Sequence, residues 1–265
     1  MIIDFHTHAF SEIIVKKAME ILAETSGLEP FTDGTVKGLC ERMDKSGVDI
    51  SVVLPIATKP AQHKIINDWA ASIRSERIYP FGTVHPYGDD ALETVERIKS
   101  LGLYGVKLHP DYQGFFANDK KAYPVYDLCS QLDIPITFHA GFDPLCPDMI
   151  HGSPEMFEQI HKDFPKLTMI LAHMGGMYRW DMVEKHIAGI DGNVYLDTAV
   201  VANEIGINPL NRIINKHGAD RILMASDCPW DDPLNEIHMI ENLDIPENDK
   251  EKILYKNACR LLNIQ

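Results

Sequence analysis

The sequence predicts a (β/α)8 barrel, the TIM-barrel fold, and three observations support this prediction. Short segments rich in apolar and β-branched residues alternate with helical patterns along the whole chain. Eight such units fit into 265 residues, close to the ~250 residues typical of this barrel. The strand segments are almost continuously apolar, as parallel strands are when helices cover their outer face. No linker or internal repeat is visible, so we expect residues 1–265 to form a single domain.

The expected elements follow one another in order. Strands are expected at residues 2–8, 49–54, 78–84, 104–108, 134–139, 167–173, 194–197 and 221–227. Helices are expected at residues 36–46, 61–74, 90–101, 122–132, 180–187, 208–217 and 247–262. A further helix is expected to begin after Ser153, its N-cap, with Pro154 at the first helical position.

The first unit is longer than the others. Ser11 is expected to cap a helix whose apolar residues have helical spacing, and residues 26–35 are expected to form a loop. The following helix is expected to end at Gly47. Because this additional material lies beside the first strand, residues 10–46 are a candidate lid.

The composition narrows the class of protein and of partner. Lys and Arg total 25 against 39 Asp and Glu, and the formal net charge of −14 repels nucleic acids and anionic membrane surfaces alike. No apolar run reaches the ~20 residues that a membrane helix needs, and no signal peptide is visible. We therefore expect a cytoplasmic protein with a small-molecule substrate, and we leave open whether it is a homo-oligomer.

The cysteines indicate a reducing compartment. They are odd in number, scattered, and never arranged as Cys-x-x-Cys: Cys40, Cys129, Cys146, Cys228 and Cys259. This pattern is typical of free thiols and argues against a disulfide framework or a thiolate zinc site.

Polar side chains end most of the predicted strands, at the edge where TIM barrels carry their functional groups. They are His6, His8, His85, Lys107, His109, His139, His173, Asp197 and Asp227. A single histidine at a strand end is usually a loop residue that bonds to the backbone. Twelve histidines placed at random would rarely end five different strands. The joint pattern of His-x-His on the first strand, His139 and His173 on the fifth and sixth, and Asp227 on the eighth, all aimed at one pocket, predicts a metal centre.

The first strand carries the densest part of this pattern, Asp4-Phe5-His6-Thr7-His8. Alternate side chains of a strand point to one face, so His6 and His8 are expected to converge, with Asp4 behind them. Neutral imidazole suits zinc, iron, cobalt or nickel, and such a pair needs only one or two further ligands. We expect Asp4 to orient one of the two histidines.

These residues and several local motifs resemble the amidohydrolase superfamily, in particular its amidohydrolase-2 branch, which includes aminocarboxymuconate semialdehyde decarboxylase. The motifs are Gly105-Val106-Lys107-Leu108-His109-Pro110, Ala172-His173-Met174-Gly175-Gly176, Ser226-Asp227-Cys228-Pro229 and Asn257-Ala258-Cys259-Arg260-Leu261-Leu262. The resemblance covers almost the whole chain and is weakest between Glu12 and Lys45. It implies a metal-dependent hydrolase or lyase on a barrel scaffold.

The resemblance also implies a role for each matching residue. One divalent metal, usually zinc with an open position for water, would be bound by His6, His8, His139 and Asp227. The metal would lower the pKa of the bound water towards ~7, and Asp227 could also accept its proton. His173 would be the catalytic histidine, which polarises a substrate oxygen or shuttles a proton.

Lys107 leaves two alternatives open. In two-metal members of the superfamily a carboxylated lysine at this place bridges the metals, so a second metal would bind if Lys107 were carboxylated. The branch that this chain resembles is mostly mononuclear, and an unmodified Lys107 could pair with a substrate carboxylate instead. We favour one metal.

Four further residues are candidates for substrate binding. His109 shares a face with Lys107, although a Leu-His-Pro turn can also use the histidine to bond the backbone. Arg179 could hold an anionic substrate, although an arginine that opens a helix is more often solvated. Tyr112 and Trp230 are expected to line the pocket because they follow strand ends.

The leading functional hypothesis is a metal-dependent hydrolase whose activated water attacks an amide, ester or lactone carbonyl. The alternative is a lyase, a non-oxidative decarboxylase or hydratase of an unsaturated or aromatic carboxylic acid, which would need a cation for the carboxylate. A third hypothesis, a binding protein that has lost catalysis, is disfavoured because every expected ligand residue is present.

Overall fold

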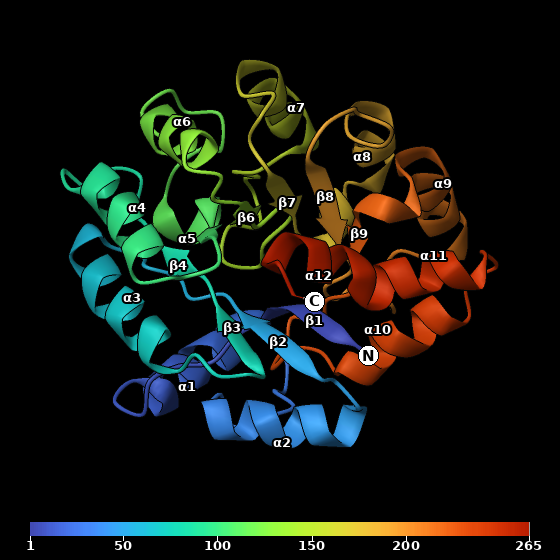
Figure 1. The fold of residues 1–265 in the computed structure, drawn as a ribbon, viewed down its shortest axis with the longest axis horizontal. Helices are drawn as coiled ribbons and strands as arrows, with labels where there is room; N and C mark the ends of the chain where they lie inside the picture. The colour runs from blue at the N-terminus through green and yellow to red at the C-terminus, as the bar shows by residue number, and fades with distance from the viewer. Residues whose placement is uncertain (265) are drawn as a thin grey trace.

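The computed structural model describes residues 1–264 and forms a closed barrel of parallel strands surrounded by helices (Figure 1). The strands of this part of the chain are β1 (Ile3–Thr7), β2 (Ile50–Val53), β3 (Ile78–Pro80), β4 (Gly82–Thr83), β5 (Val106–Leu108), β6 (Ile136–Phe138), β7 (Met169–Leu171), β8 (Val194–Asp197) and β9 (Ile222–Leu223). Neighbouring strands pair in parallel, in the orders β1-β2-β3 and β4-β5-β6-β7-β8-β9. The predicted TIM barrel is confirmed.

The strand predicted at residues 78–84 is interrupted at Phe81, which separates β3 from β4. The N–H of Phe81 donates to the carbonyl of Val53 (2.9 Å), whereas the N–H of Gly82 donates to the carbonyl of Gly105 (2.8 Å). The chain changes its pairing partner at this point, so β3 and β4 together occupy one position in the barrel. The described strands therefore fill the eight predicted positions.

The first and last strands close the barrel through main-chain hydrogen bonds. The N–H of Asp227, just after β9, donates to the carbonyl of His6 (2.8 Å). The N–H of His8 donates in turn to the carbonyl of Cys228 (2.7 Å). His6, His8 and Asp227, which are predicted metal ligands, are therefore neighbours along the seam of the barrel, the line at which β1 pairs with the segment after β9.

Helices form a ring around the strands, as Figure 1 shows. They are α1 (Val15–Ser26), α2 (Val36–Ser46), α3 (His63–Ser72), α4 (Ala91–Ser100), α5 (Pro110–Gln113), α6 (Tyr123–Gln131), α7 (Pro154–Asp163), α8 (Trp180–His186), α9 (Ile207–His217), α10 (Pro233–Glu241), α11 (Glu247–Glu251) and α12 (Asn257–Leu262). Short 3-10 turns are η1 (Pro60–Gln62), η2 (His173–Gly175) and η3 (Ala219–Arg221), and η4 (Lys252–Lys256) is π-helical. Within residues 1–264, no helix has the length and apolar character needed to cross a bilayer.

The structure adds two helices, α5 and α10, to those predicted. The α10 helix has a recognisable start, because the side chain of Asp232 accepts the N–H of Leu234 (3.1 Å) and Pro233 occupies the first helical position. The α5 helix is too short to show a periodic pattern. The helix predicted at residues 247–262 is present as α11 and α12, joined by the π-helical η4.

The helix boundaries confirm one predicted end and correct one start. The α2 helix ends at Gly47, whose φ of 73° is in the left-handed region. The α1 helix begins at Val15, later than predicted: residues 12–14 form a turn in which the carbonyl of Ser11 accepts the N–H groups of Ile14 and Val15, and no side chain caps the helix start. Ser153 occupies the N-cap position of α7 as predicted, but without a side-chain cap bond.

Residues 10–46, the predicted lid, contain two helices that attach to the barrel differently. Leu39 and Met43 of α2 are each only 1% exposed, so this helix is packed into the core. The α1 helix buries only Met19. We therefore confine the proposal of a lid to α1.

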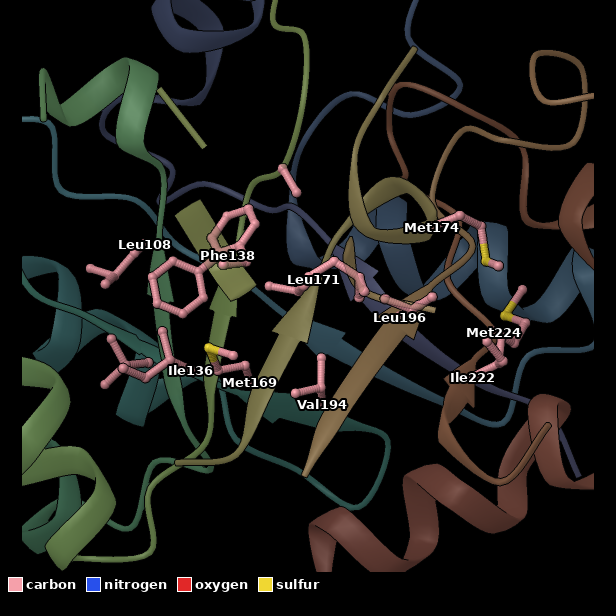
Figure 2. Packing of buried hydrophobic residues seen from close by; sticks show 14 of the residues in the cluster. Leu108, Ile136, Phe138, Met169, Leu171, Met174, Val194, Leu196, Ile222 and Met224 are labelled. Carbon is pink, nitrogen blue, oxygen red and sulfur yellow. The ribbon is translucent and has the colours of Figure 1, made fainter. Parts of the chain in front are cut away.

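Two apolar clusters hold the barrel together. The first lies under the helices, and Figure 2 shows its side chains on neighbouring strands: Leu108, Ile136, Phe138, Met169, Leu171, Val194, Leu196 and Ile222. Ile170 lies between Met169 and Leu171 and so points to the opposite face, into the barrel. It belongs to the second cluster, together with Ile3, Val52, Leu223 and the α12 residues Ala258 and Leu262. The α12 helix therefore covers the end of the barrel at which the strands begin.

We expect the substitution Asn257→Ala to lower the free energy of unfolding by about 2–4 kcal/mol, since each buried polar group left unsatisfied costs about 1–3 kcal/mol. The fully buried amide of Asn257 donates to the carbonyls of Ala219 and Ile222 (2.7 Å each). Urea denaturation followed by circular dichroism measures the change. The matched control is Asn242→Ala, which removes one bond from an exposed amide; equal effects of the two substitutions would contradict this account.

Candidate metal centre

The carboxyl ends of the strands surround a cavity of about 850 Å3. It is lined by most of the residues that the sequence singles out, namely His6, His8, Lys107, His109, Tyr112, His139, His173, Asp227 and Trp230. Arg179, at the N-cap of α8, is not among the lining residues. The structure thus brings the predicted ligand, catalytic and substrate-binding residues to one cavity, apart from Arg179.

The ring nitrogens of His6 and His8 have roles that their partners define. His6 Nδ1 lies 3.0 Å from Oδ2 of Asp197, at the end of β8. His8 Nδ1 lies 2.8 Å from the main-chain carbonyl of Leu54, just after β2. Because a carboxylate and a carbonyl only accept, each Nδ1 carries the ring proton and each Nε2 keeps a lone pair.

These two Nε2 atoms face the carboxylate of Asp227. Its Oδ1 lies 3.4 Å from His6 Nε2 and 2.9 Å from His8 Nε2. His6 Nε2, His8 Nε2 and Asp227 Oδ1 therefore converge, each with a lone pair and with no ring proton between them. Two imidazoles and a carboxylate are ordinary ligands of zinc and related divalent ions, so this group fits a metal.

The backbone turns sharply where two of these side chains enter the cavity. Asp227 has a φ of 68° and His173 a φ of 58°, both in the left-handed region that few residues other than glycine adopt. Strained backbone of this kind concentrates at functional sites, where the surrounding structure stabilises it. The conformation therefore supports a role for both residues.

Lys107 places a buried amine at the floor of the cavity. Its side chain is fully buried, and Nζ lies 3.3 Å from His6 Nε2. Burial lowers the pKa of Lys107 to about 8, although the carboxylates of Asp227 and Asp197 oppose the shift. A buried amine beside the candidate metal group is compatible with both alternatives predicted for this residue.

The rings of His139 and His173 are in contact at the lining of the cavity. His173 Nδ1 lies 2.8 Å from the carbonyl of Ala199 and therefore carries its proton. His173 Nε2 lies 3.1 Å from His139 Nδ1, so a proton or a metal ion must lie between two nitrogens that would otherwise both present lone pairs. His139 is not part of the compact group formed by His6, His8 and Asp227.

The other ring nitrogen of His139 faces two buried carboxylates. His139 Nε2 lies 3.8 Å from Oδ2 of Asp143 and 3.9 Å from Oδ2 of Asp111. Asp143 Oδ2 also lies 3.5 Å from His109 Nε2, and burial raises the pKa of Asp143 to about 7. The ring of His109 stacks on the rings of His139 and Tyr112, with centroids 4.1 Å and 3.8 Å apart, respectively.

Asp111 and Asp143 are site residues that the sequence analysis missed. Each follows a strand end that carries a predicted site residue: Asp111, two residues after His109, lies in the short α5 helix, and Asp143, four residues after His139, lies in a loop. Loops at this edge of a TIM barrel carry function, and this position is the signal that could have identified them.

The predicted role of Asp4 is wrong. The pairing register of β1 shifts between Asp4 and Thr7, and the carboxylate of Asp4 instead accepts the N–H of Ser226 (2.9 Å) and its hydroxyl. Asp197 orients His6 in its place, and its Oδ1 also accepts the N–H of His173 (3.0 Å). The sequence shows that Asp197 ends an apolar strand, but it does not show that Asp197 contacts His6 of β1.

Comparison with known proteins gives a consistent result. A family model described as Amidohydrolase matches residues 3–264. Gamma-resorcylate decarboxylase from a Polaromonas species is 25% identical over 224 residues, which span 66% of this chain and 66% of that protein. The crystal structure of 5-carboxyvanillate decarboxylase LigW from Sphingomonas paucimobilis has a TM-score of 0.74 and 18% identity, and the match covers 100% of this chain and 99% of that one.

One further solved structure is informative about metals. A dihydroxybenzoic acid decarboxylase from a Polaromonas species, crystallised with bound manganese and the inhibitor 2-nitroresorcinol, has a TM-score of 0.72 and 18% identity. The match covers 99% of this chain and 97% of that one. Structural likenesses at this level of identity establish the barrel fold for the present chain.

We expect Asp197→Asn to weaken the binding of a divalent metal by about 10–100-fold, the usual effect of losing a carboxylate that orients a ligand histidine. An amide nitrogen opposite His6 Nδ1 would favour the tautomer with the proton on Nε2, which removes the lone pair that a metal needs. Competition with a chromogenic chelator measures the affinity for Mn2+ and Zn2+. Asp191→Asn, on the exposed loop before β8, is the matched control; an affinity unchanged in Asp197→Asn would argue against the orienting role.

Proposed function

Because the chain belongs to the amidohydrolase family, we propose that it is a metal-dependent lyase that removes carbon dioxide from an aromatic carboxylic acid without an oxidant. The named relatives are decarboxylases of such acids, which supports the alternative predicted from the sequence better than the hydrolase. The observation that carries the proposal is Lys107, a buried amine beside the acceptors His6, His8 and Asp227. As an ammonium it would pair with the substrate's carboxylate.

We assign one divalent metal to the site, manganese or zinc, held by His6, His8 and Asp227 with Nδ1 of His139 as a fourth ligand. When bound, this metal would hold oxygen atoms of the substrate and withdraw negative charge from them. For His139 to bind through Nδ1, its Nε2 must carry the proton. Oδ2 of Asp143 and Oδ2 of Asp111 lie 3.8 Å and 3.9 Å from this Nε2, beyond hydrogen-bond distance. A shift of either carboxylate by about 1 Å would let it accept the Nε2–H and orient the histidine, as carboxylates do for metal-bound histidines.

The remaining residues would carry out the proton transfer and shape the site. The bond between the ring and the carboxylate breaks, carbon dioxide leaves, and the electron pair stays on the ring carbon, which takes up one proton. We propose that His173, protonated on both ring nitrogens, delivers this proton from Nε2 and takes up another from water afterwards, because its Nδ1 is fixed on the carbonyl of Ala199 and the residue lines the cavity. Tyr112 and Trp230 line the cavity and would pack against the aromatic ring.

We expect the metal-loaded protein to convert 2,6-dihydroxybenzoate to resorcinol, and Lys107→Met to lower kcat/KM by about 10–100-fold, because a hydrogen bond to a charged group contributes about 1.5–3 kcal/mol. Chromatography of the product measures the rate. Lys17→Met, at the rim of the same cavity, is the matched control. Hydrolysis of lactones or amides without turnover of any aromatic acid would contradict the proposal.

We further expect elemental analysis to find one transition metal per chain. Two metals per chain, with a second that depends on bicarbonate in the buffer, would instead indicate that Lys107 is carboxylated. The variant Lys107→Met separates these outcomes. In the binuclear case it would bind one metal fewer than the wild type, whereas in the mononuclear case the metal content of the two proteins would be equal.

A further inference from the structure

The cavity has two parts of different chemistry. Its floor carries the histidines, Lys107 and Asp227 described above. Its upper part is an apolar groove between two helices, which we call the α1–α3 groove and which consists of Ile14, Ala18, Ile21, Leu22, Ile65 and Trp69. Both parts belong to one continuous cavity.

The groove is an apolar face that the chain itself does not cover. On α1, Ala18, Ile21 and Leu22 lie on one side of the helix, as residues three and four positions apart do. Such a side normally packs against the core, yet Ile21 is 50% exposed, and Ile65 on α3 is 73% exposed. Both residues line the same cavity as the histidines of the floor, so one bound molecule could contact the floor and also cover these residues.

The size of the cavity exceeds the needs of a small aromatic acid. A volume of about 850 Å3 is near the upper end of ligand pockets, which span ~300–1,000 Å3 and enclose molecules of drug size. A single ring with its carboxylate and hydroxyl groups would occupy only the floor. The remaining space is bordered mainly by aliphatic side chains; apart from Lys107, Asp143 and Asp227 near the histidines, the charged groups of the lining are Lys17 and Glu204.

We infer that the substrate is an aromatic acid with a long apolar substituent, which lies in the α1–α3 groove while the carboxylate reaches Lys107. This inference rests on the proposed decarboxylase function and adds the substrate class. A substituent on the ring carbon opposite the carboxylate would point away from the floor and towards the groove. Each methylene group that enters it should strengthen binding by about two- to fourfold, as expected for burial of apolar surface.

Binding of reaction products tests this inference without turnover. Resorcinols with straight alkyl chains of one to seven carbons at carbon 5 are titrated into the metal-loaded protein by calorimetry. We expect Kd to fall by about two- to fourfold per methylene group. In Ile21→Asp and Ile65→Asp the gain per methylene group should be mostly lost, while resorcinol itself binds as before.

The matched control is Ile207→Asp on α9, because Ile207 is 53% exposed and does not line the cavity. It should keep the full gain with chain length. The inference is overturned if the wild type shows no gain, or if both groove variants retain it. It is also overturned if sedimentation reveals a dimer that the groove variants dissociate and Ile207→Asp does not, since a second copy would then cover the groove.

The outcome also separates this inference from the proposed function. Decarboxylation of 2,6-dihydroxybenzoate without any effect of chain length would leave the function standing and remove the substrate class. Binding that depends on chain length, without decarboxylation of any acid, would leave the groove as a binding site and remove the proposed reaction.

Discussion

The site depends on the hydrogen bonds that fix the Nδ1 atoms of His6 and His8. Their acceptors, Asp197 and the carbonyl of Leu54, come from other strands, so only the closed barrel supplies both. They leave two Nε2 lone pairs directed at the carboxylate of Asp227. Lone pairs directed at a carboxylate favour a cation between them, which is the reason why we propose a metal at this place. Lys107 lies beside this group, with its Nζ 3.3 Å from the Nε2 of His6.

The sequence was sufficient for the fold and for most of the floor, because alternation of apolar strands with helices and polar strand ends are local patterns. It was insufficient where a contact depends on register. A shift in the pairing of β1 turns Asp4 towards Ser226, and Asp197 takes over the orientation of His6. Arg179 opens the α8 helix, as the sequence indicated, but it does not line the cavity, which the sequence could not show.

The two parts of the cavity come from parts of the chain with different degrees of family resemblance. The floor is built from strand ends, where the motifs of the amidohydrolase family are clearest. The groove is built partly from α1, within the segment where the resemblance is weakest. A barrel can keep its chemistry at the strand ends while the segments above them change, since those segments contribute little to the core. On this view the reaction and the choice of substrate reside in separate regions of one cavity.

The seam between β1 and β9 also has a consequence for the biosynthesis of the protein. Asp4 and Ser226, which are hydrogen-bonded across this seam, are 222 positions apart in the sequence. Contacts between such distant segments form late, because the intervening chain must first be ordered. On the ribosome, His6 and His8 emerge early but would lack Asp227 until nearly the whole barrel has been translated. The metal that we propose for these residues would therefore enter only after the last strand is in place.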